Sequence, residues 1–341
     1  GALADRVGYI RITFLAQTAT ALVAVAFAAV TLAGWITIEL VLLFTLLIGS
    51  LEALTTPARI ALVHALVPKQ DLAAAIGLQS ATFNGCRFIG PAIASFIIAF
   101  AGSGAVLVAV AGTFVQFCFV ITIIRADEPK RNPGPWRDLM REMGDGIRYS
   151  MDHVGIRFLF VMLGVTGFLI RPIIELMPAF SAEVFDSGSA GFGILVSAIG
   201  LGAMISCLWV GVRGQTTGLT RLVTHSLLVQ GAVLILSTLT GYIWLAAAFL
   251  AIVGFAMLVG GVGSQTLIQN AVEANVRARV ISLFIVISWG TPAIGALIAG
   301  WVADFAGLAV TIAAGGAMTV ALWFWALRLV HIVEQDLEAA A

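Results

Sequence analysis

Residues 67–102 read VPKQDLAAAIGLQSATFNGCRFIGPAIASFIIAFAG, and residues 272–307 read VEANVRARVISLFIVISWGTPAIGALIAGWVADFAG. The two stretches align without a gap at an offset of 205 residues (272 − 67 = 205). Each copy joins a charged loop to an apolar run. A direct repeat of this kind predicts a fold of two similar halves, related by an axis along the membrane normal if the chain spans a bilayer. The identical pairs include Val67 with Val272, Leu78 with Leu283, Gly90 with Gly295, Ile93 with Ile298, Ala94 with Ala299, Phe100 with Phe305, Ala101 with Ala306 and Gly102 with Gly307.

The composition excludes an ordinary soluble domain. Of the 341 residues, 60% are hydrophobic and 11% are charged, against roughly 45–50% and about 25% in soluble domains. The apolar runs are continuous rather than alternating, which predicts transmembrane helices and not a β-barrel. Ten runs are long enough to span a membrane, at about 10–32, 36–58, 79–101, 104–125, 157–179, 190–212, 222–242, 244–268, 279–302 and 306–329.

The positions of the positive charges predict the orientation. If residue 1 is cytoplasmic, every lysine and arginine except Arg87 and Arg171 lies in a cytoplasmic segment. The positive-inside rule then places both termini in the cytoplasm. The formal net charge is zero, so nothing in the charge balance indicates nucleic acid as a partner.

One segment interrupts the apolar pattern and predicts the domain organisation. Residues 126–156 are rich in proline and charge and are typical of a linker. We expect an N-terminal half at 1–125, this cytoplasmic linker, a C-terminal six-helix half at 157–330 and a cytoplasmic tail at 331–341. Within the linker, apolar residues at helical spacing predict an amphipathic helix that lies on the membrane surface or packs on the ends of the bundle: Trp136, Leu139, Met140, Met143 and Ile147.

The first eleven residues, GALADRVGYIR, resemble the loop signature of the major facilitator superfamily. In that family the signature lies between the second and third helices. The repeat agrees, because at the same offset the span near 157 would correspond to a segment before residue 1. The expected fold is therefore an all-α major facilitator fold with ten of an expected twelve transmembrane helices (four plus six), lacking the first two, in two pseudo-symmetric halves.

Further motifs resemble particular branches of this superfamily. Residues 87–94, RFIGPAIA, are similar to the Gly-Pro motif of drug and siderophore exporters, although Ala94 and Ser95 stand where exporters often have two glycines. Residues 66–72 and 276–280 resemble the branch of the enterobactin exporter and the macrolide-efflux (transmembrane secretion effector) proteins. The second copy of the loop signature, at 213–221, is degenerate.

The resemblance implies roles for two motifs. The loop signature together with Arg59 implies a cytoplasmic gate made of Gly1, Asp5, Arg6, Gly8, Arg11 and Arg59, in which Asp5 holds the end of the span that begins near Arg279. The other motif, Gly90 and Pro91, implies a helix bend that limits leakage, with a plain kink as the alternative.

Ionisable groups within apolar spans are candidates for substrate binding or ion coupling, because they are costly to place there. Arg171 and Glu175 stand four residues apart and are expected on one helix face, either facing a central cavity or forming a structural ion pair. Arg87 is a candidate anion contact or a side chain that reaches toward the cytoplasmic face. The resemblance implies that Glu52 pairs with the signature arginines, and the alternative is an ordinary interfacial glutamate.

No catalytic or metal-binding constellation is readable. The four histidines are scattered, the three cysteines have no metal-ligand spacing, and no phosphate-binding GxxxxGK loop is present. We therefore predict no enzyme activity, no metal and no cofactor; the expected partners are the lipid bilayer, a small-molecule substrate and protons. The predicted function is proton-coupled efflux of amphipathic or siderophore-like molecules across a bacterial inner membrane. The alternatives are an uptake symporter of the same fold and a non-transporting truncated membrane protein.

Overall fold

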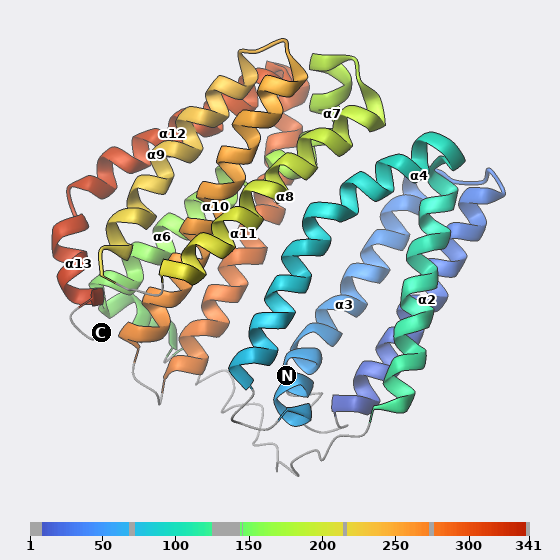
Figure 1. The fold of residues 1–341 in the computed structure, drawn as a ribbon, viewed down its shortest axis with the longest axis horizontal. Helices are drawn as coiled ribbons and strands as arrows, with labels where there is room; N and C mark the ends of the chain where they lie inside the picture. Colours follow the sequence, from blue (N-terminus) through green and yellow to red (C-terminus); the bar gives the residue numbers. More distant parts are fainter. Residues whose placement is uncertain are drawn as a thin grey trace. The chain divides into compact units, whose positions relative to one another are not determined.

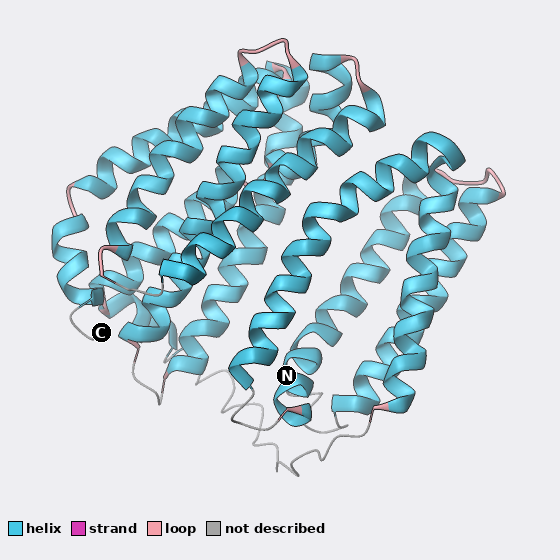
Figure 2. Cartoon of the chain, in the orientation of Figure 1, coloured by secondary structure: helices cyan, strands magenta, loops and turns pink. Residues whose placement is uncertain are grey.

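The computed structural model describes residues 9–67, 72–124, 144, 146–213, 217–272 and 276–338. The regular structure of these residues is helical throughout (Figure 2), which confirms the predicted all-α class. In chain order the helices are α2 (Tyr9–Leu32), α3 (Ile38–Leu66), α4 (Leu72–Ile123), α6 (Val154–Leu169), α7 (Ile173–Phe185), α8 (Gly188–Arg213), α9 (Leu219–Thr238), α10 (Ile243–Ala271), α11 (Arg277–Ala306), α12 (Leu308–Leu327) and α13 (Val330–Glu338), as labelled in Figure 1.

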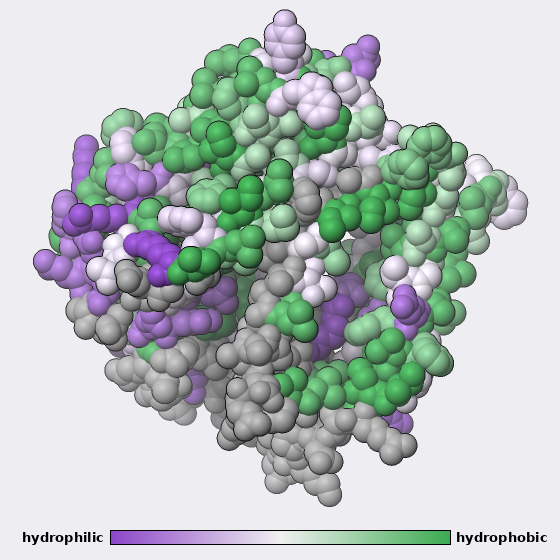
Figure 3. Space-filling view, viewed as in Figure 1, coloured by the Kyte–Doolittle hydropathy of each residue, from purple (hydrophilic) through white to green (hydrophobic). Residues whose placement is uncertain are grey.

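Eight helical segments among the described residues are long and apolar enough to cross a membrane. Many large apolar side chains on them face outward, such as Leu22, Phe119 and Leu297, and apolar residues cover much of the face shown in Figure 3. Lipid can solvate such surfaces, whereas water cannot. The chain is thus a multi-pass membrane protein. The predicted span 36–58 overlaps α3, and the predicted span 79–101 falls within α4; the total of ten spans stays a prediction.

The sequence repeat has a counterpart in the backbone. α4 contains a non-helical residue, Gly102, with φ 78° and ψ 172°, so it consists of two consecutive helices. Gly307, which separates α11 from α12, has φ 84° and ψ 150°. Positive φ is accessible to glycine at little cost and is strained for other residues. The repeat therefore places the same glycine-dependent break between consecutive helices of each copy.

Contacts divide the chain into two compact units, one of Gly1–Phe83 with Ala94–Pro135 and one of Asn84–Ile93 with Trp136–Ala341. In the first unit, the rings of Phe27 in α2 and Phe44 in α3 stack at 4.9 Å between centroids. The hydroxyl of Thr18 in α2 lies 3.8 Å from the Cys118 sulfur in α4. These contacts join α2 to both neighbouring helices.

Glycines set how closely the helices of the second unit approach. A Cβ on Gly202 of α8 would overlap the carbonyl oxygen of Ala251 in α10, and a Cβ on Gly254 of α10 would overlap the carbonyl oxygen of Ile199 in α8. Because lipid supplies no hydrophobic drive between helices, such backbone contact is a main source of attraction. α8 and α10 are therefore held by reciprocal glycine contacts.

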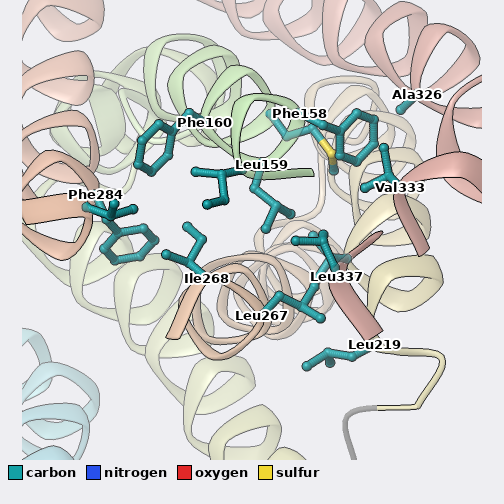
Figure 4. Close-up of a cluster of buried hydrophobic side chains, with 14 of the residues drawn as sticks. Phe158, Leu159, Phe160, Leu219, Leu267, Ile268, Phe284, Ala326, Val333 and Leu337 are labelled. Carbon is teal, nitrogen blue, oxygen red and sulfur yellow. The ribbon is translucent and has the colours of Figure 1, made fainter. Parts of the chain in front are cut away.

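A cluster of buried apolar side chains lies within the second unit (Figure 4). It joins α6, α9, α10, α11 and the short helix α13, so the last helix is packed against the bundle rather than extending from it. The expected tail at 331–341 is thus largely helical and part of the core. The buried members of the core include Phe158, Leu159, Leu219, Leu267, Ile268, Phe284, Val333 and Leu337.

Candidate functional site

The first span of the second unit is interrupted near its middle. α6 ends at Leu169, α7 begins at Ile173, and residues 170–172 form a turn between them. Pro172 has no N–H, so it cannot donate to the carbonyl of Phe168 as a helix would require. Instead the N–H groups of Ile170 and Arg171 both donate to the Thr166 carbonyl, at 2.9 and 3.2 Å. Interrupted spans of this kind often form substrate and ion sites in transporters.

A second proline lies within α11, which stays helical through it. Pro292 lies inside α11 and leaves the carbonyl of Ser288, four residues earlier, without its usual helix donor. Arg171 supplies a replacement, since its Nη1 atom donates to that carbonyl at 2.9 Å. The guanidinium therefore ties the turn between α6 and α7 to the proline site of α11.

The backbones of α6 and α11 are in close contact beside this hydrogen bond. A Cβ on Gly167 would overlap the hydroxyl of Thr291, and a Cβ on Gly295 would overlap the carbonyl oxygen of Phe168. Gly295 therefore lets α11 lie against the carbonyl that Pro172 leaves without a helix donor. The break is packed tightly by protein, which fits the rule that irregular backbone at membrane depth is not left facing lipid.

Glu175 lies in the first turn of α7 and is exposed, whereas Arg171 is half-buried. The sequence predicts the two residues on one helix face; the structure places Arg171 in the turn at 170–172 and Glu175 in α7, and the shared face stays a prediction. A carboxylate in the first turn of a helix is stabilised by the helix dipole. The structure thus places the acid at the start of one helix and holds the arginine by a neighbouring carbonyl.

The other acidic candidate, Glu52, pairs with a residue predicted for the gate. Its Oε2 atom lies 2.5 Å from Nη2 of Arg59, two turns further along α3, and both side chains are partly exposed. Spacing seven residues apart on one helix brings the two groups to the same side. The structure therefore joins Glu52 to the predicted gate through Arg59.

The structure describes the remaining predicted residues only in part. Arg11 is exposed on α2, and Gly90 is exposed in α4, where a Cβ would meet nothing within 4 Å. Arg87 and Pro91 belong to α4, but their side chains lie outside the described part of the structure. The predicted Gly1, Asp5, Arg6 and Gly8, and most of the predicted linker helix, also lie outside the described residues. Among the residues described, no group of three or more His, Cys, Asp or Glu side chains could hold a metal ion.

A polar stripe on α2 was not predicted from the sequence. Thr13, Gln17 and Thr20 are each at most 1% exposed, and their spacing of four and three residues places them on one helix face. Ser226 and Gln230 in α9 form a similar buried pair, in which Gln230 Nε2 lies 3.2 Å from Ser226 Oγ and 3.3 Å from the Ala256 carbonyl oxygen of α10. Polar residues at helical spacing within an apolar run are the sequence signal from which both buried polar groups could have been predicted.

The sequence profile of the family described as "Transmembrane secretion effector" matches residues 1–341. The Staphyloferrin A transporter of Staphylococcus aureus is 25% identical over 294 residues, which cover 84% of this chain and 71% of that protein. Macrolide efflux protein A of Streptococcus pyogenes is 25% identical over 258 residues, which cover 72% of this chain and 60% of that protein. The matched part is thus less than two thirds of the macrolide relative's length.

Two solved structures share the fold. A bacterial homologue of the human lysosomal transporter Spinster superposes with a TM-score of 0.63 at 14% identity, covering 99% of this chain and 86% of that chain. The Escherichia coli fucose:proton symporter superposes with a TM-score of 0.61 at 14% identity, covering 96% of this chain and 85% of that one. At this identity the likeness concerns the fold alone.

Proposed function

This chain belongs to the transmembrane secretion effector family of major facilitator transporters, and from that premise we propose that it exports small amphipathic or siderophore-like molecules in exchange for protons. Its family and the relatives named above are transporters rather than enzymes. The lipid bilayer and a small-molecule substrate are accordingly its partners. Both termini face the cytoplasm in this proposal, in the inner membrane of a bacterium.

The substrate class rests on the relatives. One is named for a siderophore, staphyloferrin A, and another for the efflux of macrolides. Outward transport is favoured by the second name and by the Gly-Pro motif at Gly90 and Pro91, which resembles that of exporters. Energy from an ion gradient is favoured because the sequence has no GxxxxGK phosphate loop.

The interrupted span α6–α7 is the observation that carries the proposed coupling. It places an exposed carboxylate, Glu175, and a half-buried guanidinium, Arg171, in a segment that is otherwise apolar enough to cross the membrane. Ionisable groups in such positions mark ion and substrate pathways. In our proposal Glu175 carries the proton, and Arg171 keeps the turn in place through the Ser288 carbonyl.

The proposed proton coupling follows from the two charge states of the Glu175 side chain. Protonation removes the charge of Glu175 and with it the favourable interaction with the N-terminus of α7. A neutral side chain is also less costly to cover when the site closes. The transporter alternates between a state open to the cytoplasm and a state open to the outside. Proton binding on one side of the membrane and release on the other would thus bias the equilibrium between these two states.

Transport assays with matched variants of α7 test this proposal. Cells that produce the protein should accumulate less of a macrolide or a fluorescent amphipathic dye than cells without it, and a protonophore should remove the difference. Glu175→Gln should abolish export driven by a proton gradient while substrate counterflow in proteoliposomes persists. Glu183→Gln, at another exposed acid of α7, is the control and should behave as the unchanged protein.

The possible results separate the parts of the proposal. Higher accumulation in producing cells would favour the uptake symporter over the exporter. Export that continues after the proton gradient is collapsed would contradict proton coupling. Equal behaviour of the two acid variants would exclude Glu175 as the proton carrier.

A further inference from the structure

The short helix α13 (Val330–Glu338) carries acidic side chains toward the beginnings of two other helices. It follows the last candidate span, α12, and contains Glu334, Asp336 and Glu338. One face of α13 is apolar and buried, so the helix has a fixed orientation on the bundle. The buried residues of that face are Val330, Val333 and Leu337.

Glu338 caps the beginning of α9. Its Oε2 atom accepts a hydrogen bond from the N–H of Gly218 at 2.6 Å, and its Oε1 atom accepts one from the N–H of Thr220 at 2.9 Å. The first N–H groups of a helix have no partner within it, and α9 has no capping side chain of its own at Gly218. A carboxylate 118 and 120 residues away in the sequence therefore supplies the cap.

A second acid of α13 binds the same end of α9. The Oε2 atom of Glu334 lies 2.9 Å from both Nε and Nη2 of Arg221. Gly218 and Arg221 belong to the degenerate second copy of the loop signature. The structure thus places α13 against that loop copy by hydrogen bonds to the backbone and by an ion pair.

Asp336 makes the corresponding contact with α6. Its Oδ2 atom accepts a hydrogen bond from the N–H of Gly155 at 2.9 Å and lies 3.1 Å from Nδ1 of His153. The latter contact is an ion pair when the imidazole is protonated. His153 stands at the cap position of α6 without a capping hydrogen bond of its own. The side chain of Leu337 lies over Gly155, where a Cβ would come within 2.7 Å of it.

From these contacts we propose that α13 is a conformational clasp that fixes the beginnings of α6 and α9 to one another. Each helix beginning binds a different carboxylate of one rigid turn of α13, and the carboxylates also interact favourably with the positive ends of both helix dipoles. During alternating access, the clasp makes this end of the second unit move as a single body. The clasp does not depend on the direction, substrate or coupling ion proposed above.

Hydrogen exchange of the protein in lipid nanodiscs tests the clasp directly. Glu338→Gln should speed exchange of the Gly218 and Thr220 amides about tenfold or more, because a hydrogen bond to a charged acceptor is lost in favour of a weaker neutral one. The Gly155 amide should change little in this variant. Asp336→Asn should have the opposite pattern and speed exchange at Gly155 only.

Gln335→Ala is the matched control, because Gln335 is exposed on α13 between the contacting acids. It should leave all three amides unchanged. Unchanged exchange in the two carboxylate variants would overturn the proposal. Equal acceleration throughout α6, α9 and α10 in either variant would also overturn it, since that would be general loosening of the bundle. Neither readout requires that the protein transports anything, so a failed transport assay would not affect it.

Discussion

Arg171, in the turn between α6 and α7, donates a hydrogen bond of 2.9 Å to the carbonyl oxygen of Ser288 in α11. That carbonyl lacks its usual helix donor because Pro292 stands four residues later. The interrupted span α6–α7 is therefore linked to the proline site of α11. This coupling can be measured, because restoring the helix bond should make the arginine less important.

A double-mutant cycle should reveal the coupling. Arg171→Ala should lower the free energy of unfolding by on the order of 1 kcal/mol, typical of polar contacts between membrane helices. Pro292→Ala restores an N–H that can donate to the Ser288 carbonyl, so Arg171→Ala should cost less in that background. Thermal or denaturant unfolding in detergent measures each step. Pro178→Ala, at the exposed proline of α7, is the control background, and an equal cost in all three backgrounds would refute the coupling.

The glycine contacts between α8 and α10 predict a position-specific loss of stability. Gly254→Ala would place a methyl group against the carbonyl oxygen of Ile199, so the helices must separate, at a cost of about 1–3 kcal/mol. Gly261→Ala in the same helix meets nothing within 4 Å and should leave stability unchanged or slightly higher. The melting temperatures of the two variants decide the point. Similar values would show that close approach at Gly254 is unnecessary.

The two repeat-related glycines should respond alike to substitution. Gly102→Ala and Gly307→Ala force alanine into a positive φ of 78° or 84°, and each should destabilise the protein by about 1–2 kcal/mol. The controls, Gly112→Ala and Gly300→Ala, lie in helices and have open space around an added Cβ. Unfolding transitions of the four variants measure the difference. A neutral result at either positive-φ glycine would argue against the matched helix breaks.

Charge reversal tests the pair in α3. Arg59→Glu should lower the melting temperature by bringing two carboxylates together, and adding Glu52→Arg should restore part of the loss. The change in the free energy of unfolding should stay below about 1 kcal/mol, because both side chains are partly exposed. The same exchange at Arg148 and Asp152, which are 4.0 Å apart and mostly exposed, is the control and should have no effect. Absence of restoration at 52 and 59 would mean that the ion pair contributes nothing measurable.

Most of the fold could be predicted because its signals are local. Apolar runs and their lengths predict the membrane helices, and the repeat led us to pair Gly102 with Gly307, where both copies have positive φ. The loop signature and the Gly-Pro motif led to the family. Of the candidate site, the expected pairing of Glu52 with the signature arginines stays a prediction, and the structure instead pairs Glu52 with Arg59, since residues two turns apart on one helix lie on the same side.

The amino-acid sequence by itself thus determined that this is a helical membrane protein with an internal repeat, in a known transporter family. Only the tertiary structure decided that Arg171 binds the carbonyl of Ser288 and that the carboxylates of Glu338 and Asp336 cap α9 and α6. The physical reason is that a proline or a helix end specifies which backbone group loses its local partner. Which distant side chain replaces that partner depends on how the helices pack.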